Sequence, residues 1–512
     1  MQPRPRFPGL DGAIAVAVAI GLTELLAGLS AAVPSAIASV GSVVVDYSPP
    51  VVKDIAIGTL GTADKGALAI GTVVVAVLIG VVIGRLSVKR FWIAIAAFGL
   101  FALLGVGVQL DQPGAERLYV LVATPFAALA GLGTLRLLYR LDASARLEDP
   151  TDGRVGDNSK RRFIAVATGA GVGAAAAMAV GRAQIIRRSE ADRLATGLPT
   201  SDNPLAAPET AHDFQLEGLT PIIQHEPDFY RIDTALIVPI VDTDSWTLRV
   251  HGLVEEEVVF SFDDIAGMEQ HDRFVTLSCV SNEVGGDLVG NARWQGVMLT
   301  DLLDMARPLD TAGQIVPRSV DGWAAGFPIE AAYDGREPIV AVGMNGVPLP
   351  RKHGYPARLV VPGLYGYVSA TKWLSEIELT TWDGFDSYWV PRGWAKEGPI
   401  KTQSRIDRPR NGQTVSEGVY TVAGVAWAPN RGIARVEVQL DEGEWQEAEL
   451  SDPLSDDAWV QWKVDVDFPV GAHRLRVRAT DGTGDTQPEQ PMPPRPDGAT
   501  GWHVIAVGTA EA

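Results

Sequence analysis

The sequence predicts a multi-domain chain in three parts: an α-helical membrane segment of about five spans, an α+β domain, and an all-β immunoglobulin-like sandwich. Residues 1–182 are rich in Ala, Val, Gly and Leu and contain no His or Cys, whereas all seven His lie beyond them. From residue 229 short strands alternate with turns and short helices, and from about residue 401 the pattern consists of strands alone. A chain of 512 residues is too long for one hydrophobic core, so several domains are expected.

Five apolar stretches in the first part approach the roughly 20 residues that are needed to cross a bilayer. They lie at 12–33, 66–84, 91–109, 118–137 and 163–181. Basic residues gather before the first span and in the segments 85–90 and 136–162, whereas 34–65 and 110–117 are less basic and carry aspartates. The positive-inside rule then predicts a cytoplasmic N-terminus in the plasma membrane, with everything after about residue 182 on the extracytoplasmic side.

Two features of the spans have alternative interpretations. The motif Ser159–Ile164 precedes the fifth span and resembles the twin-arginine export signal of proteins that fold around a cofactor, with Lys160 replacing the first arginine. Basic residues are also expected beside an ordinary span. Glu24 lies within the first span, where a carboxylate either has a function or hydrogen-bonds a neighbouring helix, and we favour the second interpretation. Because a membrane haem normally needs axial His ligands, no haem is predicted.

Charge and composition give expectations about partners and about the boundaries of the domains. The formal net charge of −19 disfavours nucleic acid as a partner, because phosphates select clustered basic surfaces. Residues 183–228, rich in Pro, Asp, Thr and Ala, predict a linker or wrapping arm. The expected divisions are therefore 1–182, 183–228, 229–400 and 401–512. The last of these is expected to serve interaction or dimerisation.

Cys279 is the only cysteine in the chain. A lone thiol cannot form an intrachain disulfide, which leaves packing, a nucleophile or a soft metal ligand. Residues 273–279 predict a strand that carries the thiol at its C-terminal end, before a polar loop that ends in two glycines, and active sites commonly lie at such positions. This context favours the ligand. The glycine-spaced loop 363–373, which includes Lys372, has the donors to hold a phosphate.

Four motifs occur in a fixed order with compatible spacing. They are Thr276–Asn282, Asn291–Gly296, Met344–Gly363 and Gly366–Leu374, and the predicted sandwich follows them. In this order they resemble the sulfite oxidase family of molybdenum enzymes, over roughly residues 228–512. The resemblance implies a sulfite-oxidase-like molybdopterin-binding domain, the molybdenum-molybdopterin cofactor, and a homodimer formed through the C-terminal domain.

The resemblance also implies roles for individual residues. By position, Cys279 is the thiolate that ligates molybdenum, which suits a soft sulfur ligand. Arg231, Tyr388 and Arg495 join it as catalytic residues around the substrate. The implied cofactor-binding residues are Phe229, Tyr230, Arg231, Asp233, Cys279, His353, Arg358, Ala370, Thr371 and Lys372. Each also has a plain structural interpretation, such as aromatic packing for Tyr388 or a surface cation for Arg358.

One departure from the family pattern concerns the substrate. Sulfite-oxidising members carry an arginine five residues after the metal cysteine, where this chain has Val284. The exchange removes a charge-assisted donor that contributes roughly 1.5–3 kcal/mol. We therefore expect oxygen-atom transfer to or from a small sulfur-containing or related substrate, with an oxyanion as one candidate. Both a sulfite oxidase and an S-oxide reductase fit.

Two further expectations concern partners. The chain has no Cys-x-x-Cys-His haem signature, so electrons must pass to a separate cytochrome or quinone-linked partner. The alternative from another functional class is a cofactor-free binding module at the cell surface, in which Cys279 is merely packed.

Overall fold

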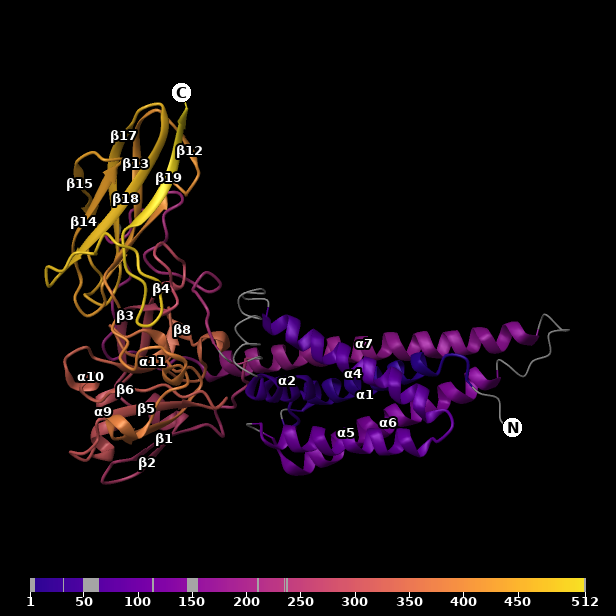
Figure 1. Ribbon diagram of the computed structural model, residues 1–512. Coiled ribbons are helices and arrows are strands. Elements are labelled where there is room, and N and C mark those ends of the chain that lie inside the picture. The colour runs from indigo at the N-terminus through magenta and orange to yellow at the C-terminus, as the bar shows by residue number, and fades with distance from the viewer. Residues whose placement is uncertain are drawn as a thin grey trace. The chain divides into compact units, whose positions relative to one another are not determined.

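The computed structural model describes residues 5–30, 32–48, 64–112, 115–144, 155–209, 211–233, 235 and 238–510. The chain forms two compact units (Figure 1). The first comprises Met1–Asp192 with Ala235–Ile240, and the second comprises Arg193–Thr234 with Val241–Ala512.

The first unit is helical. Its elements are α1 (Pro8–Leu29), α2 (Ala36–Tyr47), α4 (Asp64–Ser87), α5 (Trp92–Leu110), α6 (Arg117–Ser144) and α7 (Val155–Thr196). All but α2 are long and apolar enough to cross a membrane, and they overlap the five predicted spans. Helix α7 continues to Thr196, past residue 182 where we expected the linker to begin. Arg and Ala are good helix formers, so the polar segment after the apolar stretch prolongs the helix.

Helix α2 lies in the less basic segment 34–65, where no helix was predicted, and Glu24 explains its start. The Glu24 carboxylate accepts hydrogen bonds from the Ser35 hydroxyl at 2.9 Å and from the Ile37 N–H at 3.1 Å. These donors lie at the N-terminus of α2, where N–H groups need acceptors. The preferred interpretation of Glu24, a hydrogen bond to a neighbouring helix, is confirmed. Residues 49–63 of that segment and 145–154 of the fourth connection lie outside the described residues.

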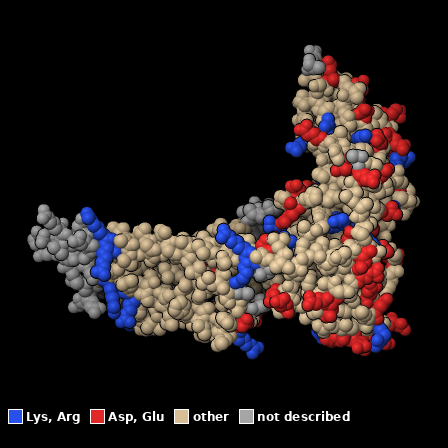
Figure 2. All heavy atoms as spheres, turned by 180° about the vertical axis from the view of Figure 1, so that it is seen from behind, with Lys and Arg blue, Asp and Glu red and all other residues tan. Residues whose placement is uncertain are grey.

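Small residues allow the helices to approach closely. A Cβ atom on Gly12 would overlap the Gly80 carbonyl of α4, and one on Gly28 would lie 2.6 Å from Gly181 of α7. Such contacts are typical of helices that associate in membranes. Figure 2 shows Lys and Arg gathered at the two ends of this unit, with a nearly uncharged surface between them.

The second unit contains one mixed sheet, in which β1 and β10 are parallel, and one antiparallel sheet. One has the order β2-β1-β10-β5-β6 and the other β3-β4-β7-β8, with β9 also paired to β7. The strands are β1 (Thr247–Gly252), β2 (Val258–Ser261), β3 (His271–Ser278), β4 (Val289–Met298), β5 (Gln314–Ser319), β6 (Phe327–Pro328), β7 (Ile339–Met344), β8 (Val347–Pro348), β9 (Arg358–Val360) and β10 (Leu374–Thr380). Short helices connect them: α8 (Phe262–Gly267), α9 (Leu299–Ala306), α10 (Glu330–Tyr333), η2 (Arg351–His353), α11 (Gly366–Ser369), η3 (Trp382–Gly384) and η4 (Val390–Arg392). This is the predicted α+β domain.

A sandwich of two sheets follows, as predicted. Its sheets have the orders β11-β13-β17-β16 and β12-β19-β18-β14-β15. The strands are β11 (Gln403–Arg408), β12 (Thr414–Ser416), β13 (Gly418–Trp427), β14 (Ile433–Leu440), β15 (Trp445–Glu447), β16 (Glu449–Leu450), β17 (Val460–Phe468), β18 (Gly471–Asp481) and β19 (His503–Ala510). Alternating residues of both sheets, including Trp462 and Phe468, form a core of their own between the sheets.

The described part of the segment between Thr196 and the first strand binds both parts of the second unit. The Ile222 carbonyl accepts bonds from the Asn291 amide in β4 and from the Trp459 indole before β17, each at 2.8 Å. The Asp213 carboxylate accepts a bond from Gln461 in β17 at 3.0 Å. This part of the predicted linker therefore lies along the α+β domain and the sandwich as a wrapping arm.

Candidate functional site

Cys279 follows β3 directly and begins the loop that joins β3 to β4. The two strands pair antiparallel up to Ser278 and Val289. The Cys279 N–H donates to the Leu288 carbonyl at 2.9 Å, which closes the loop behind the thiol. Cys279 is 9% exposed, and its Sγ lies 2.9 Å from the Ser281 hydroxyl. Burial raises the pKa of the Cys279 thiol, while the hydroxyl and amide of Ser281 oppose that rise.

A cluster of rings connects the thiol to the other predicted residues, and Phe229 lies at its centre. Phe229 stacks on Tyr230 with ring centroids 5.4 Å apart, and it meets Trp294 edge-on at 5.7 Å and His353 edge-on at 5.4 Å. Burial raises the pKa of Tyr230, the Cys279 thiol adds to the rise, and Arg358 opposes it. The phenol is therefore close enough to interact with both the thiol and the arginine.

Three predicted cations lie near these rings, and two of them bind one carboxylate. Asp233, whose side chain is 2% exposed, accepts a bond from Arg231 at 2.7 Å and from Lys372 at 2.9 Å. Arg358 is 4% exposed and lies over the Trp294 ring at 4.8 Å. Its guanidinium also donates to the His353 carbonyl at 3.1 Å. The cluster thus has more positive than negative side chains, which prepares it for an anion.

The backbone brings Arg358 and Lys372 together at one glycine. Gly354 has a φ of +116°, and a Cβ there would lie 2.9 Å from the Cβ of Arg358 and 3.1 Å from the Cα of Lys372. Burial lowers the pKa of Arg358 to about 10, and burial with the neighbouring arginines lowers the pKa of Lys372. Burial, together with the surrounding cations, lowers the pKa of His353 to about 3, so its imidazole is neutral at physiological pH.

Two buried polar atoms in this cluster lack partners among the residues that the structure describes. They are the Thr371 hydroxyl, in a residue with 0% exposure, and Nε of Arg358. Buried donors without acceptors are rare in folded proteins and indicate an absent group. An oxygen-rich anion such as a phosphate fits them, so the donor set suits the terminal phosphate of molybdopterin.

Tyr388 and Arg495 form a second group, linked through Arg392. The Arg392 guanidinium lies 3.7 Å from the centroid of the Tyr388 ring, and Arg495 donates to the Arg392 carbonyl at 2.5 Å. Trp323 and Trp389 pack on the Tyr388 ring at 5.8 and 5.0 Å. The structure thus joins these two predicted residues through Arg392, whose guanidinium contacts Tyr388 and whose carbonyl binds Arg495, and which we did not predict.

Tyr365 is a further residue that was not predicted to belong to the site. A Cβ on Gly498, in the C-terminal domain, would overlap its hydroxyl. Burial raises the pKa of Tyr365 to about 12, and Asp497 and Cys279 both add to the rise. Its place between the thiol and the C-terminal domain arises from folding, and the only sequence signal is the glycine spacing of the loop that contains it.

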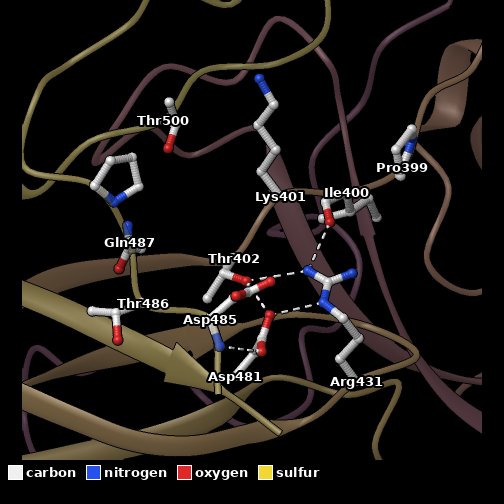
Figure 3. Close-up of a pocket in the computed structure, with 11 residues that line it drawn as sticks. Pro399, Ile400, Lys401, Thr402, Arg431, Asp481, Asp485, Thr486, Gln487 and Thr500 are labelled. Carbon is white, nitrogen blue, oxygen red and sulfur yellow. Dashed lines mark hydrogen bonds and ion pairs between the residues drawn. The ribbon is translucent and has the colours of Figure 1, made fainter. Parts of the chain in front are cut away.

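A cavity in the second unit is lined by other residues. It has a volume of about 400 Å³ and lies at the junction between the α+β domain and the sandwich (Figure 3). Arg431 donates there to Asp481 at 2.8 Å and to the Ile400 carbonyl at 3.0 Å. None of the predicted site residues lines it.

Comparison with known proteins agrees with this geometry. Residues 235–389 match the oxidoreductase molybdopterin binding domain, and residues 397–507 match the Mo-co oxidoreductase dimerisation domain. The fold and the site thus define a molybdopterin-dependent oxidoreductase.

Individual relatives indicate the family within this class of enzymes. Mitochondrial sulfite oxidase of Homo sapiens is 31% identical over 307 residues, which cover 50% of this chain and 56% of that protein. The uncharacterized oxidoreductase YuiH of Bacillus subtilis is 31% identical over 157 residues, covering 31% of this chain and 76% of that protein. The chain belongs to the sulfite oxidase family, whose cofactor is molybdenum-molybdopterin. It spans little more than half the length of the human relative.

A solved structure also aligns with the chain. The crystal structure of the sulfane dehydrogenase SoxCD from Paracoccus pantotrophus is 23% identical, with a TM-score of 0.48, and the alignment covers 61% of this chain and 91% of that one. Family membership favours the enzyme over the binding module.

Proposed function

We propose that this protein is a membrane-anchored molybdenum-cofactor oxidoreductase that transfers an oxygen atom to or from a small sulfur-containing substrate. The observation that carries the proposal is the placement of the lone thiol at the end of β3, beside Tyr230, which also interacts with the buried cation cluster. The thiol that would ligate the metal and a cation that would bind the cofactor phosphate thus both interact with Tyr230.

The chain's own residues hold and orient the group. Cys279 would ligate the metal, and Arg358, Lys372 and Thr371 would bind the phosphate, with Asp233 keeping Lys372 in place. The neutral His353 can accept or donate one hydrogen bond without adding charge. When bound, the cofactor supplies two-electron oxygen-atom transfer. In the direction of sulfite oxidation, sulfite and water give sulfate, two protons and two electrons.

Arg495 and Arg392 are the cations proposed to attract an anionic substrate near Tyr388. Val284 replaces an arginine of the sulfite-oxidising members, so we expect weaker binding of sulfite than in those proteins. Neutral S-oxides are the competing substrates, because an apolar side chain at this position costs them no ion pair.

The five apolar helices support a plasma-membrane location, with the second unit on the extracytoplasmic side. Reporter fusions after residues 60, 88, 113, 150 and 200 should then read outside, inside, outside, inside and outside. We further propose a homodimer formed through the C-terminal domain, and electron exchange with a separate cytochrome or quinone-linked partner. A cytoplasmic reading after residue 200 would overturn the orientation.

Metal analysis of the full-length protein tests the central proposal. Purified from a host that makes molybdopterin, the wild-type chain should hold about one molybdenum, and Cys279→Ser should lose it. Ser281→Ala, which keeps the thiol, is the matched control and should retain the metal. A metal-free wild type would refute the proposal. Sulfite with an electron acceptor, tested beside S-oxides with a reduced dye, then decides the direction.

A further inference from the structure

The tip of the loop after Cys279 is tight. The Leu288 N–H donates to the Asn282 side chain at 2.9 Å, which fixes the base of the loop. At the tip, the Gly286 N–H donates to the Glu283 carbonyl at 2.9 Å, and Gly285 has a φ of +76°. Val284 is half-buried directly before these two glycines.

Two residues of the C-terminal sandwich contact this tip. Arg405 in β11 donates to the Gly286 carbonyl at 2.8 Å. His503 at the start of β19 lies so close to Gly285 that a Cβ on that glycine would overlap the imidazole. The tip is therefore held between a guanidinium and a ring that both belong to the other domain.

Further hydrogen bonds within the second unit hold both side chains in place. Arg405 is 9% exposed, and it also donates to Asp407 at 2.6 Å and to the Thr220 hydroxyl at 2.8 Å. Nδ1 of His503 accepts a bond from the Ile406 N–H at 2.9 Å. Side chains that are held in one rotamer by such contacts position a loop more accurately than mobile ones.

We propose that Arg405 and His503 are positioning residues for the metal loop, so that the C-terminal domain sets where Val284 and the Cys279 thiol lie in the substrate pocket. The inference rests on the proposed function of Cys279. It assigns the sandwich a role in the site in addition to dimerisation.

The contact differs from the general interface between the two domains. That interface is formed independently by the Thr276 N–H, which donates to the Asp457 carbonyl at 2.9 Å, and by the Trp459 N–H, which donates to the Thr276 hydroxyl at 2.8 Å. Loss of Arg405 should therefore free the loop tip while the domains stay docked.

Arg431 provides a matched control for this contact. Like Arg405 it joins an aspartate of the sandwich to a backbone carbonyl outside the sandwich strands, Asp481 to Ile400, but it does so at the cavity of Figure 3. Arg405→Met and Arg431→Met therefore remove comparable bonds, and only the first of them touches the metal loop.

The first measurement uses the full-length chain made in a host without molybdopterin. Cys279 is the only thiol, so the rate at which N-ethylmaleimide adds to the protein reports the opening of its loop directly. Loss of a charge-assisted bond should make Arg405→Met react about tenfold faster, whereas Arg431→Met should stay within about twofold of wild type. Equal rates in the two variants would overturn the proposal.

His503→Ala is the second test variant, to be used if Arg405→Met no longer unfolds in a cooperative melting transition. It should also speed the reaction, and a wild-type rate would count against the proposal. In the cofactor-loaded enzyme, Arg405→Met should keep its molybdenum and raise KM more than it lowers kcat, because Val284 shifts in the substrate pocket while Cys279 remains present as a metal ligand. Because the thiol assay needs no cofactor, it decides this inference even if the wild-type chain holds no molybdenum.

Discussion

Replacing Lys372 should separate cofactor binding from stability. The ammonium donates to Asp233 at 2.9 Å and to the Ile232 carbonyl at 3.0 Å, and its side chain is 10% exposed. Without a phosphate it is a buried cation close to Arg358 and Arg231. In Lys372→Met, Asp233 keeps Arg231 as a partner and one repulsive charge disappears. The free energy of unfolding of the cofactor-free chain should therefore change by less than about 1 kcal/mol.

Cofactor binding, unlike stability, should change strongly in Lys372→Met. A charge-assisted hydrogen bond to phosphate contributes roughly 1.5–3 kcal/mol, and each 1.4 kcal/mol is tenfold in affinity. Lys372→Met should therefore weaken cofactor binding roughly ten- to hundredfold, measured as molybdenum and releasable pterin per chain. Stability is followed by tryptophan fluorescence, because all of the 13 tryptophans except Trp92 lie in the second unit.

Lys396 is the matched control for this experiment. It too donates to an aspartate, Asp386, and to backbone carbonyls, those of Trp382 and Phe385, all within 2.8 Å. Lys396→Met should lower the stability by about 1–3 kcal/mol and leave the cofactor content unchanged. Wild-type cofactor content in Lys372→Met would refute the assignment of the anion pocket.

Three further predictions follow from the site and the membrane segment. Ser281→Ala removes the hydroxyl 2.9 Å from Sγ and should lower the molybdenum reduction potential by on the order of tens of millivolts, measured by redox titration with electron paramagnetic resonance. The folded chain holds His353 neutral until about pH 3, whereas the unfolded chain binds that proton near pH 6.5, so stability should fall as pH drops below about 6.5. His353→Gln should make this loss shallower in urea titrations of the cofactor-free chain, and an unchanged slope would contradict the pKa assignment. If Ser159–Ile164 is a twin-arginine signal, replacing Lys160 and Arg161 with Gln should block export of the second unit while the first four spans still insert, as reporter fusions would show.

Much of the architecture could be predicted because its signals are local. Apolar length gives the spans, and alternation gives strands such as Gly418–Trp427 within a few residues. Helix α2 was missed because its first turn depends on Glu24, an acceptor from another helix. The end of α7 was missed because composition changes at residue 182 while helix propensity does not.

The site residues also divide into those that a sequence signal indicated and those that none indicated. Cys279, His353 and Lys372 lie in motifs, so their order along the chain indicated their role. Arg405 and His503 carry no such signal, because a guanidinium reaches the Gly286 carbonyl only after β11 has been placed against the metal loop. Sequence spacing cannot show a contact between residues more than a hundred positions apart.

The burial of the anion pocket in the second unit bears on the export signal proposed in the first part of the chain. Arg358 is 4% exposed, Thr371 is 0% exposed, and the Lys372 side chain is 10% exposed, so a phosphate held by all three is enclosed when the domain has folded. A group that is enclosed by folding must be present while the domain folds or enter through local opening. If the second unit is extracytoplasmic, as proposed, and folds around the cofactor in the compartment that makes molybdopterin, it must cross the membrane already folded. A signal for export of folded proteins, such as the one that Ser159–Ile164 resembles, would meet that requirement. An ordinary span that passes an unfolded chain would not.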